Sequence, residues 1–308
     1  MSPPTDTVPT GPILTAPPPW NTKATMYLIP FWTSSRTAAN LPEKAYHPFE
    51  YQSSFSSPQA SGKPLGGLSM VQIIRYHSTP VGPYDELILC PGTFEYPLPD
   101  SQHEAEPTTK KKTGKAMRIT RIYVSQKYTC WNGRKLWNLP KHLAHFIWST
   151  PDPSNPEIQT LRVYPHDHSP PGGVPYNPAE PTPSTTPFFK CTLKVIPYLP
   201  SFPFSNLWLP KMGIDVSLVQ PPLPENSQAS QGELPGTSEW VKMGGYEQVS
   251  KRCKVMWADL NQKEDGEEGK GEDNFFPGLK RWNLGVVMED GEANFVEGER
   301  WAAPRHTL

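Results

Sequence analysis

Lys141 is the side chain in this sequence best suited to nucleophilic chemistry. It lies between Pro140 and His142, within a stretch (132–146) that is dense in Trp, Leu, Ala and Phe. Burial among apolar groups disfavours the ammonium, and the ordinary lysine pKa of about 10.4 must fall before the amine is nucleophilic at neutral pH. A desolvated Lys141 could therefore add to a carbonyl carbon. The alternative interpretation is one more surface lysine.

A carboxylate that could serve such an amine lies in a second segment. Glu86 ends the sequence GPYDE (82–86), at the start of an apolar run (84–91) that reads as a strand. A positioned carboxyl can act as a general acid or base. The alternative interpretation is an ordinary strand carboxylate that pairs with Arg75 or Arg121.

One short motif suggests a metal. In the sequence His166-Asp-His168, two imidazoles at positions i and i+2 would share one face of a strand. Because no third ligand lies near them and a Pro/Gly-rich stretch follows, we expect a turn here and no metal ion or other cofactor.

Composition excludes several classes of protein. The 308 residues carry 29 Lys plus Arg against 30 Asp plus Glu, so the clustered basic excess of a nucleic-acid-binding protein is missing. The 40 prolines exclude a helical bundle, because proline inside a helix costs about 3 kcal/mol. The four cysteines show no C-x-x-C spacing, which favours reduced thiols over zinc ligands or disulfides. With no signal peptide and no apolar run of about 20 residues, we expect a cytoplasmic protein without membrane contact.

Short alternating segments with turn residues between them fill most of the chain. The clearest is 117–129 (MRITRIYVSQKYT), which predicts a strand. Asn132-Gly133 follows it and is typical of a hairpin turn. Many short strands and few helices indicate a β-sandwich or β-barrel.

Several longer segments resemble the acetoacetate decarboxylase-like proteins, and most closely a fungal-type branch of them. The elements shared with the wider family are a Pro-Tyr-x-Glu motif and a Pro-Lys motif. The segments that carry the resemblance are 80–89 (PVGPYDELIL), 121–126 (RIYVSQ), 131–144 (WNGRKLWNLPKHLA), 197–203 (PYLPSFP) and 217–224 (SLVQPPLP).

The resemblance implies a mainly β fold with some α, namely a closed antiparallel, cone-shaped β-barrel with short peripheral helices. It covers about residues 20–300, so we expect one barrel domain there. Residues 1–19 would form a flexible Pro-rich tail and residues 301–308 a second tail.

By the same resemblance, Lys141 would be the lysine that forms a Schiff base and Glu86 the carboxylate beside it. Activation of such a lysine by desolvation or by a neighbouring cation is known from acetoacetate decarboxylase itself. Tyr84, His142 and Trp137 are candidates for substrate binding, although Tyr84 could simply pack and the sequence favours a core position for Trp137. The implied activity is decarboxylation of a β-keto acid, either acetoacetate-like or polyketide-derived as in fungal secondary metabolism, by a lyase that needs no cofactor.

The sequence also departs from the family. Bacterial decarboxylases have a second lysine where this chain has His142, which leaves apolar burial as the main influence on Lys141. The family uses an arginine from its N-terminal region, and Arg36 and Arg75 are candidates by position alone. Two alternatives therefore stay open, an imine-dependent aldolase or dehydratase and a non-catalytic barrel that binds a hydrophobic metabolite. The small-molecule keto acid is the expected partner, and a homo-oligomer is left open.

Overall fold

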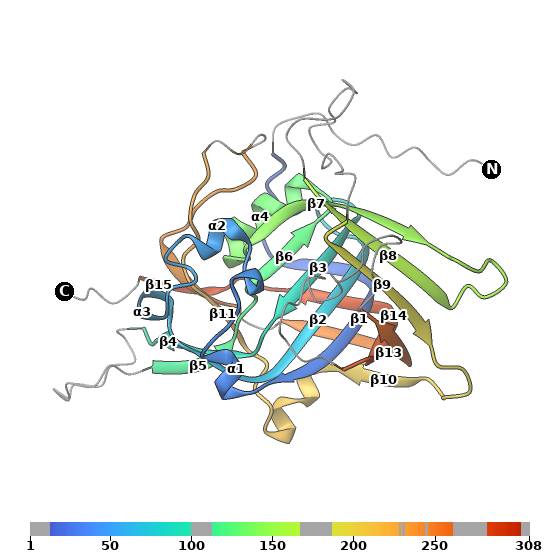
Figure 1. The fold of residues 1–308 in the computed structure, drawn as a ribbon. Coiled ribbons are helices and arrows are strands. Elements are labelled where there is room, and N and C mark those ends of the chain that lie inside the picture. Colours follow the sequence, from blue (N-terminus) through green and yellow to red (C-terminus); the bar gives the residue numbers. More distant parts are fainter. Residues whose placement is uncertain are drawn as a thin grey trace, which may run out of the picture.

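Nine strands close into one β-barrel, as the resemblance implies (Figure 1). The computed structural model describes residues 13–99, 113–166, 187–227, 229, 232–243, 246–260 and 282–302. Around the barrel the order is β1, β14, β13, β9, β8, β7, β6, β3 and β2, and β2 pairs again with β1. The barrel strands are β1 (Trp20–Thr33), β2 (Pro64–Ser78), β3 (Tyr84–Cys90), β6 (Arg121–Val124), β7 (Lys141–Ser149), β8 (Ile158–Pro165), β9 (Phe189–Val195), β13 (Glu247–Asp259) and β14 (Leu284–Phe295).

Smaller elements surround the barrel. Strand β10 pairs with β13, and the other short strands extend from the start of β2 as a side sheet. These strands are β4 (Thr93–Pro97), β5 (Thr113–Met117), β10 (Phe202–Ser205), β11 (Leu218–Gln220), β12 (Glu239–Met243) and β15 (Glu299–Ala302). The helices are α1 (Ser35–Ala38), α2 (Pro48–Tyr51), α3 (Pro58–Ser61) and α4 (Lys127–Trp137), with 3-10 turns η1 (Glu43–Ala45), η4 (Asn206–Trp208) and η5 (Pro210–Met212).

The barrel is antiparallel except at one pair. Strands β6 and β7 are parallel, and every other neighbouring pair around the barrel is antiparallel. Parallel strands need a crossover connection, which is usually helical. Helix α4 supplies it between β6 and β7, so the expectation of a purely antiparallel barrel is mostly right and fails only here.

The hairpin expected at Asn132-Gly133 is wrong, because both residues lie inside helix α4. Strand β6 is only four residues long, and the rest of the expected strand belongs to the helix. Local capping explains the change: the Gln126 side chain accepts a hydrogen bond from the Thr129 backbone N–H at the start of the helix. Asn138 ends the helix in the left-handed conformation at φ 51°. Gly133 is not a turn residue here, because it lies in the helix and packs against the Lys141 side chain.

The parallel pair fixes which way each side chain of β7 points. Ile122 of β6 lies opposite Lys141, and Tyr123 lies opposite His142. Successive residues of a strand point to opposite faces. Lys141 therefore shares a face with Ile122, whereas His142 points the other way.

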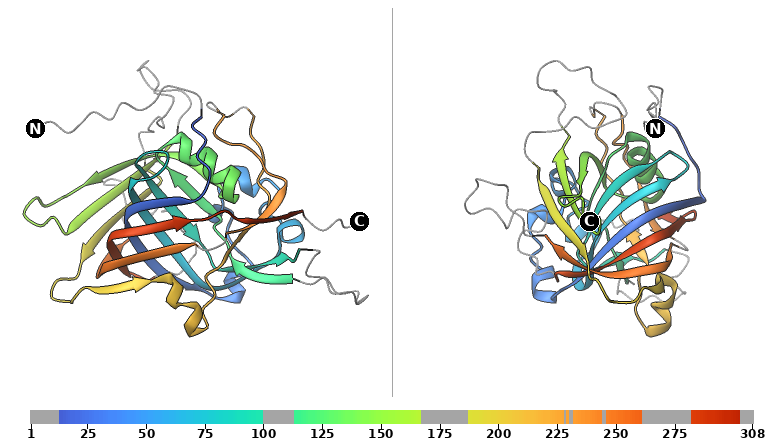
Figure 2. Two further views of the ribbon diagram at one scale, coloured as in Figure 1. Left: turned by 180° about the vertical axis from the view of Figure 1, so that it is seen from behind. Right: turned by 90° about the vertical axis from the view of Figure 1, so that its right-hand side faces the viewer.

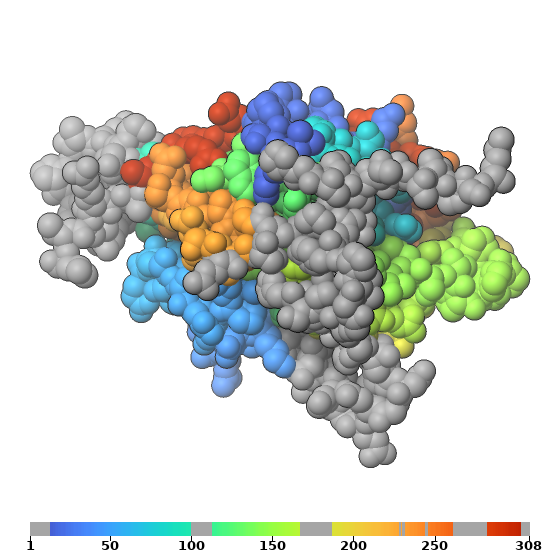
Figure 3. Space-filling view, turned by 90° about the horizontal axis from the view of Figure 1, so that it is seen from above, coloured from blue at the N-terminus to red at the C-terminus, as the bar shows by residue number. Residues whose placement is uncertain are grey.

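Helix α4 and the turns η4 and η5 lie at opposite ends of the barrel in both Figure 1 and Figure 2. The described part of the N-terminal segment packs on the helix, where Asn132 donates a hydrogen bond to the Leu14 carbonyl and accepts one from the Ala16 N–H. Seen from above, the light-blue segment that contains α2 lies beside the orange segment between β11 and β12 (Figure 3). These two segments meet at the polar cluster described below.

Two features of the described chain complete the fold. The four cysteines are all buried and unbonded to one another. Of the helices that the structure describes, none has the length and apolar character required to cross a membrane.

Candidate functional site

Lys141 and Glu86 meet in a buried ion pair. The Lys141 Nζ atom lies 2.7 Å from Glu86 Oε2, and each residue is only 3% exposed. Nζ also donates a hydrogen bond of 2.9 Å to Thr129 Oγ1. The alternative partners of Glu86 are engaged elsewhere, because Arg75 pairs with Asp85 and Arg121 donates to the Tyr123 hydroxyl. Two residues that are 55 positions apart in the chain are thus brought into contact.

Helix α4 packs against Lys141. A Cβ atom at Gly133 would lie 2.6 Å from Lys141 Cδ and 2.7 Å from Cε, so a larger residue would displace the end of the lysine side chain. The Cys130 thiol donates to the Lys141 carbonyl at 3.3 Å. Gly133 is therefore required by packing against Lys141, not by a turn.

Tyrosines surround the carboxylate. Tyr84 lies under the amine, with Nζ 5.2 Å from its ring centroid, and its hydroxyl is hydrogen-bonded to Thr129 and Tyr76. Burial raises the pKa of Tyr84 and Tyr76 well above 10, and the negative charge of Glu86 raises both further. The same two causes raise the pKa of Tyr246. All three therefore remain protonated and uncharged at neutral pH.

Glu86 lines a cavity of about 90 Å³. A roughly 150 Å³ apolar cavity holds benzene, so this one suits a ligand of few atoms. Glu86 belongs to the described lining but Lys141 does not, which places the carboxyl between the amine and the cavity. Most of the wall is apolar and includes Leu28, Ile88, Met117, Ile122, Leu139 and Phe295.

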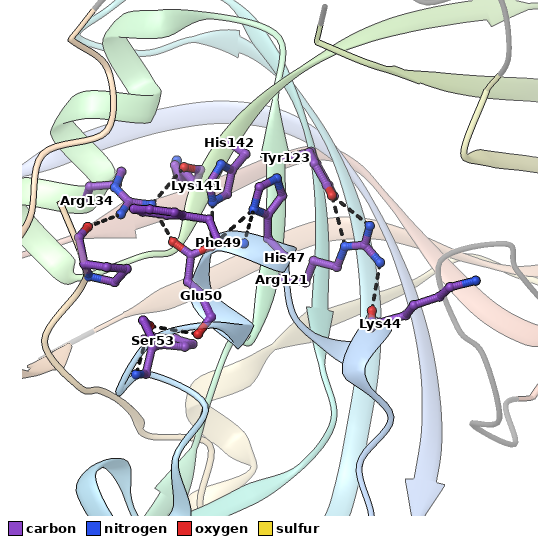
Figure 4. Close-up of polar contacts among 12 residues, drawn as sticks. Lys44, His47, Phe49, Glu50, Ser53, Arg121, Tyr123, Arg134, Lys141 and His142 are labelled. Atoms are coloured by element: carbon purple, nitrogen blue, oxygen red, sulfur yellow. Dashed lines mark hydrogen bonds and ion pairs between the residues drawn. The ribbon is translucent and has the colours of Figure 1, made fainter. Parts of the chain in front are cut away.

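His142 belongs to a second buried cluster on the opposite face of β7 (Figure 4). Its Nε2 lies 2.6 Å from Glu50 Oε2, and Arg134 Nη1 lies 2.9 Å from Glu50 Oε1. The His47 ring stacks on the His142 ring with centroids 3.4 Å apart. His47 and His142 also line a hollow of about 310 Å³. The structure thus separates His142 from the cavity that Glu86 lines.

The electrostatics of this second cluster keep the carboxylate charged and the imidazoles neutral. Burial alone would raise the Glu50 pKa, but contacts with His142 and Arg134 outweigh it and lower the pKa. Burial lowers the pKa of His142, against the opposing effect of Glu50. Burial lowers the pKa of His47 well below 6.5, and His142, Arg121 and Arg134 add to this.

His47, Glu50 and His142 are also a candidate metal-ligand set, since their donor atoms lie within 4.8 Å of one another. The two imidazole rings are nearly parallel, at 11°, so a single ion cannot lie in the plane of both. His47 Nδ1 already accepts the Phe49 N–H, and Arg134 already holds Glu50. The present arrangement is a hydrogen-bonded cluster, and coordination would require the rings to turn.

The remaining sequence candidates lie apart from the ion pair. Trp137 is 2% exposed, packs against Trp20 and Phe295, and donates from Nε1 to the Val296 carbonyl. Arg36 is exposed on α1, and Arg75 sits 4.5 Å from the Trp148 ring centroid. Neither arginine is among the described residues that line the cavity. His166 lies at the end of the described range, and Asp167 and His168 fall outside it.

Sequence reasoning missed Thr129, Glu50 and Arg134, each of which contacts the site or its support. Thr129 lies in a segment that the sequence predicts as a strand, and nothing in that pattern indicates its contact with Lys141. Glu50 and Arg134 are 84 positions apart. The only local signal for them is that Arg134 stands in an apolar run and Glu50 in an aromatic one (46–55).

Comparison with known proteins agrees with the fold. No protein-family model matches the chain, and no curated protein matches it at the sequence level. Among solved structures, acetoacetate decarboxylase from Legionella pneumophila aligns over 94% of this chain and 89% of its own, with a TM-score of 0.51 at 10% identity. The chain has the fold of acetoacetate decarboxylase.

A second similar structure is the enduracididine biosynthesis enzyme MppR, complexed with the condensation product of pyruvate and imidazole 4-carboxaldehyde. It aligns over 94% of this chain and 92% of its own, with a TM-score of 0.49 at 12% identity. An acetoacetate decarboxylase-like enzyme from Sphingomonas wittichii aligns with a TM-score of 0.43 at 11% identity.

Proposed function

We propose that this chain is a Schiff-base-forming lyase that decarboxylates a small β-keto acid through an imine on Lys141. The observation that carries the proposal is the buried contact of 2.7 Å between Lys141 Nζ and a carboxylate, Glu86, that lines a cavity. An amine in contact with a carboxylate can pass its proton across and become a nucleophile. The resemblance to a fungal-type branch is what suggests a polyketide-derived keto acid among the substrates.

The first half of the reaction needs only these two groups. Glu86 takes a proton from the Lys141 ammonium, and the neutral amine adds to the ketone carbon. A second proton moves from nitrogen to the former carbonyl oxygen, giving a carbinolamine. Protonated Glu86 then returns its proton to that hydroxyl, and water leaves. The product is a protonated imine beside a carboxylate, so all three ammonium protons are accounted for.

The second half uses the imine as an electron sink. The bond between the α-carbon and the substrate carboxylate breaks, carbon dioxide leaves, and the electron pair forms an enamine. The α-carbon then takes one proton from the Glu86 carboxyl, which regains it from solvent. Water hydrolyses the imine and restores the Lys141 ammonium. Positioned acid–base groups of this kind typically accelerate a step about 10²- to 10⁴-fold.

Because Glu86 stands between Lys141 and the cavity, the carboxyl must swing aside before a carbonyl carbon reaches Nζ. Such a rotation keeps the carboxyl near the carbinolamine oxygen that it must protonate. Rotation of Glu86 would therefore open the path for the substrate, and its carboxyl would transfer the protons of the reaction.

Aldol condensation or dehydration through the same imine is the second candidate. Among the described residues that line the cavity, Glu86 is the one charged group, and it is negative. A second carboxylate placed next to it would be repelled, which favours a carbonyl compound without one. The non-catalytic metabolite-binding barrel remains the third candidate, and the same experiment distinguishes it.

The test is reduction with borohydride in the presence of acetoacetate, followed by mass analysis of peptides. We expect an adduct on Lys141 and carbon dioxide release by the wild-type protein, and neither by Lys141→Met. Lys135→Ala, which removes an exposed lysine from helix α4, should behave as wild type. An adduct without carbon dioxide would select the aldol or dehydration reaction. No adduct with any keto compound would refute imine chemistry.

A further inference from the structure

A pair of buried amides forms a second polar feature of the cavity that Glu86 lines. Gln248 Nε2 donates a hydrogen bond of 2.8 Å to Gln72 Oε1. Gln72 is 7% exposed and Gln248 is 4% exposed, and both belong to the cavity wall. The other polar residues of this mostly apolar wall are Tyr76, Glu86, Asn206 and Tyr246. Buried amides are costly unless their hydrogen-bonding groups are used.

The amide pair is incompletely satisfied. Gln72 Nε2 donates to the Met70 thioether sulfur at 2.7 Å, and a thioether is only a weak acceptor. The backbone N–H of Gln248 donates to Asn206 Oδ1 at 2.8 Å, which anchors this residue beside turn η4. Within the described residues, Gln248 Oε1 takes part in no hydrogen bond. The pair therefore offers one anchored acceptor and a donor with a poor partner.

The register of the sheet places the amides at a fixed distance from the ion pair. Ile74 lies opposite Glu86, and Gln72 lies opposite Ile88. Gln72 is therefore one side-chain row along the strand from the Glu86 row, which corresponds to about 7 Å. A short chain that starts at an imine on Lys141 and passes Glu86 would end beside Gln72 and Gln248.

The chemistry of the wall also restricts the charge of that chain end. Amides can satisfy a hydroxyl or a carbonyl oxygen, but they cannot neutralise an anion in an apolar surrounding. No lysine, arginine or histidine is among the described lining residues, and the charged one is Glu86. A neutral polar group matches this end of the cavity best.

We propose that Gln72 and Gln248 form a specificity subsite for a neutral hydroxyl or oxo group at the far end of the carbonyl substrate. The substrate class is then a short aliphatic carbonyl compound with an uncharged polar tail, whichever reaction follows at the imine. The position of the reacting carbon rests on the proposed function, whereas the recognition of the tail rests on the amides alone.

Three probes with the same carbon skeleton test the subsite: pentan-2-one, 5-hydroxypentan-2-one and 4-oxopentanoate. Binding is measured by ligand-observed NMR on the Lys141→Met protein, where no imine can form, and by borohydride trapping on the wild type. We expect the hydroxyl probe to bind roughly three- to ten-fold more tightly than pentan-2-one, the range of one net neutral hydrogen bond. We expect 4-oxopentanoate to bind most weakly of the three.

The variants Gln72→Leu and Gln248→Leu should each abolish the preference for the hydroxyl probe over pentan-2-one. Because this preference is a ratio of two ligands on one protein, a partial loss of folding does not alter it. Gln59→Leu, at an exposed position on α3, is the matched control and should keep the preference.

The two proposals fail in different ways. Absence of trapped adduct, with the hydroxyl preference intact on Lys141→Met, would refute the imine but support the subsite. Trapping without any hydroxyl preference, or with 4-oxopentanoate bound best, would refute the subsite and leave the imine standing.

Discussion

A buried carboxylate lies on each side of strand β7, next to cationic or imidazole groups. The two carboxylates differ in their hydrogen bonding. Both oxygens of Glu50 are bonded, one to Arg134 and the other to His142. Glu86 Oε2 lies 2.7 Å from Lys141 Nζ without hydrogen-bond alignment, and Glu86 lines a cavity. Glu50 is thus held by buried partners at both oxygens, whereas Glu86 faces a cavity that can admit a ligand.

This difference separates a structural cluster from a candidate reactive one. A fully satisfied buried network makes a structure rigid and specific, because every alternative arrangement loses hydrogen bonds. A buried polar atom that lacks a well-aligned partner needs another explanation, and a catalytic role is one of them. Glu50 and Arg134 also brace the site, since Arg134 donates to the Lys141 carbonyl at 3.2 Å.

The largest effect should follow from Glu86→Gln. The amide cannot accept the Lys141 proton, so we expect the rate of adduct formation with acetoacetate to fall about 10²- to 10⁴-fold. The rate is measured by intact mass during reduction with cyanoborohydride. Asp85→Asn is a matched control, because Asp85 is the neighbouring carboxylate on the opposite face and pairs with Arg75. An unchanged rate in Glu86→Gln would remove Glu86 from the mechanism.

Glu50→Gln should affect stability instead. It leaves the fully buried Arg134 guanidinium without its carboxylate, and breaking a buried pair in this way costs about 3–5 kcal/mol. We expect a lower urea midpoint with an unchanged m-value. The exposed Glu43→Gln should leave the free energy of unfolding within about 0.5 kcal/mol of wild type. If Glu50→Gln were as stable as wild type but lost adduct formation, the roles assigned to the two carboxylates would be reversed.

Gly133→Ala tests the link from the helix to the ion pair. Alanine is normally favoured over glycine in a helix by about 1 kcal/mol, but here its Cβ would meet the Lys141 stem at 2.6 Å. We expect little net change in stability and a loss of roughly tenfold or more in adduct rate, because a displacement near 1 Å can cost about 100-fold. Lys135→Ala, an exposed change in the same helix, should leave the rate unchanged. A wild-type adduct rate in Gly133→Ala would show that the lysine side chain can shift without loss of reactivity, contrary to this prediction.

Much of the fold was predictable from the sequence, and the exception is instructive. Proline density and alternating segments indicated strands, and the family resemblance implied the closed barrel that the structure shows. The helix at Lys127–Trp137 was not predicted, because its residues alternate like a strand at first and Asn132-Gly133 is typical of a turn. Tertiary contacts add to the local caps at Gln126 and Asn138: Asn132 bonds to the N-terminal segment and Gly133 packs on Lys141.

The candidate site was predictable in part for a different reason. Lys141 and Glu86 each stand in a short local motif, so the resemblance could single them out. Side-chain direction on β7 depends on the parallel register with β6, which the sequence does not reveal, and His142 therefore could not be placed. Gln72 and Gln248, 176 positions apart, carry no local signal at all.

The smallest effect should come from pH, and it again distinguishes the two faces. Burial lowers the pKa of both His47 and His142 below 6.5, so the unfolded chain binds protons first as the pH falls. Their contribution is complete above about pH 6.5 and is lost progressively below it. We expect the free energy of unfolding to drop by about 1–2 kcal/mol between pH 7.5 and pH 5.5.

A carboxyl on strand β3, Asp85, opposes this trend, and removing it should make the effect of the histidines clearer. Burial raises the pKa of Asp85 to about 6, more than the pairing with Arg75 lowers it. A carboxyl whose pKa is raised on folding adds stability as the pH falls through 6, so Asp85→Asn should steepen the loss measured by urea unfolding. Adding His47→Leu to that background should flatten it. If the slope were the same in all three proteins, other groups than this imidazole pair would control the acid response.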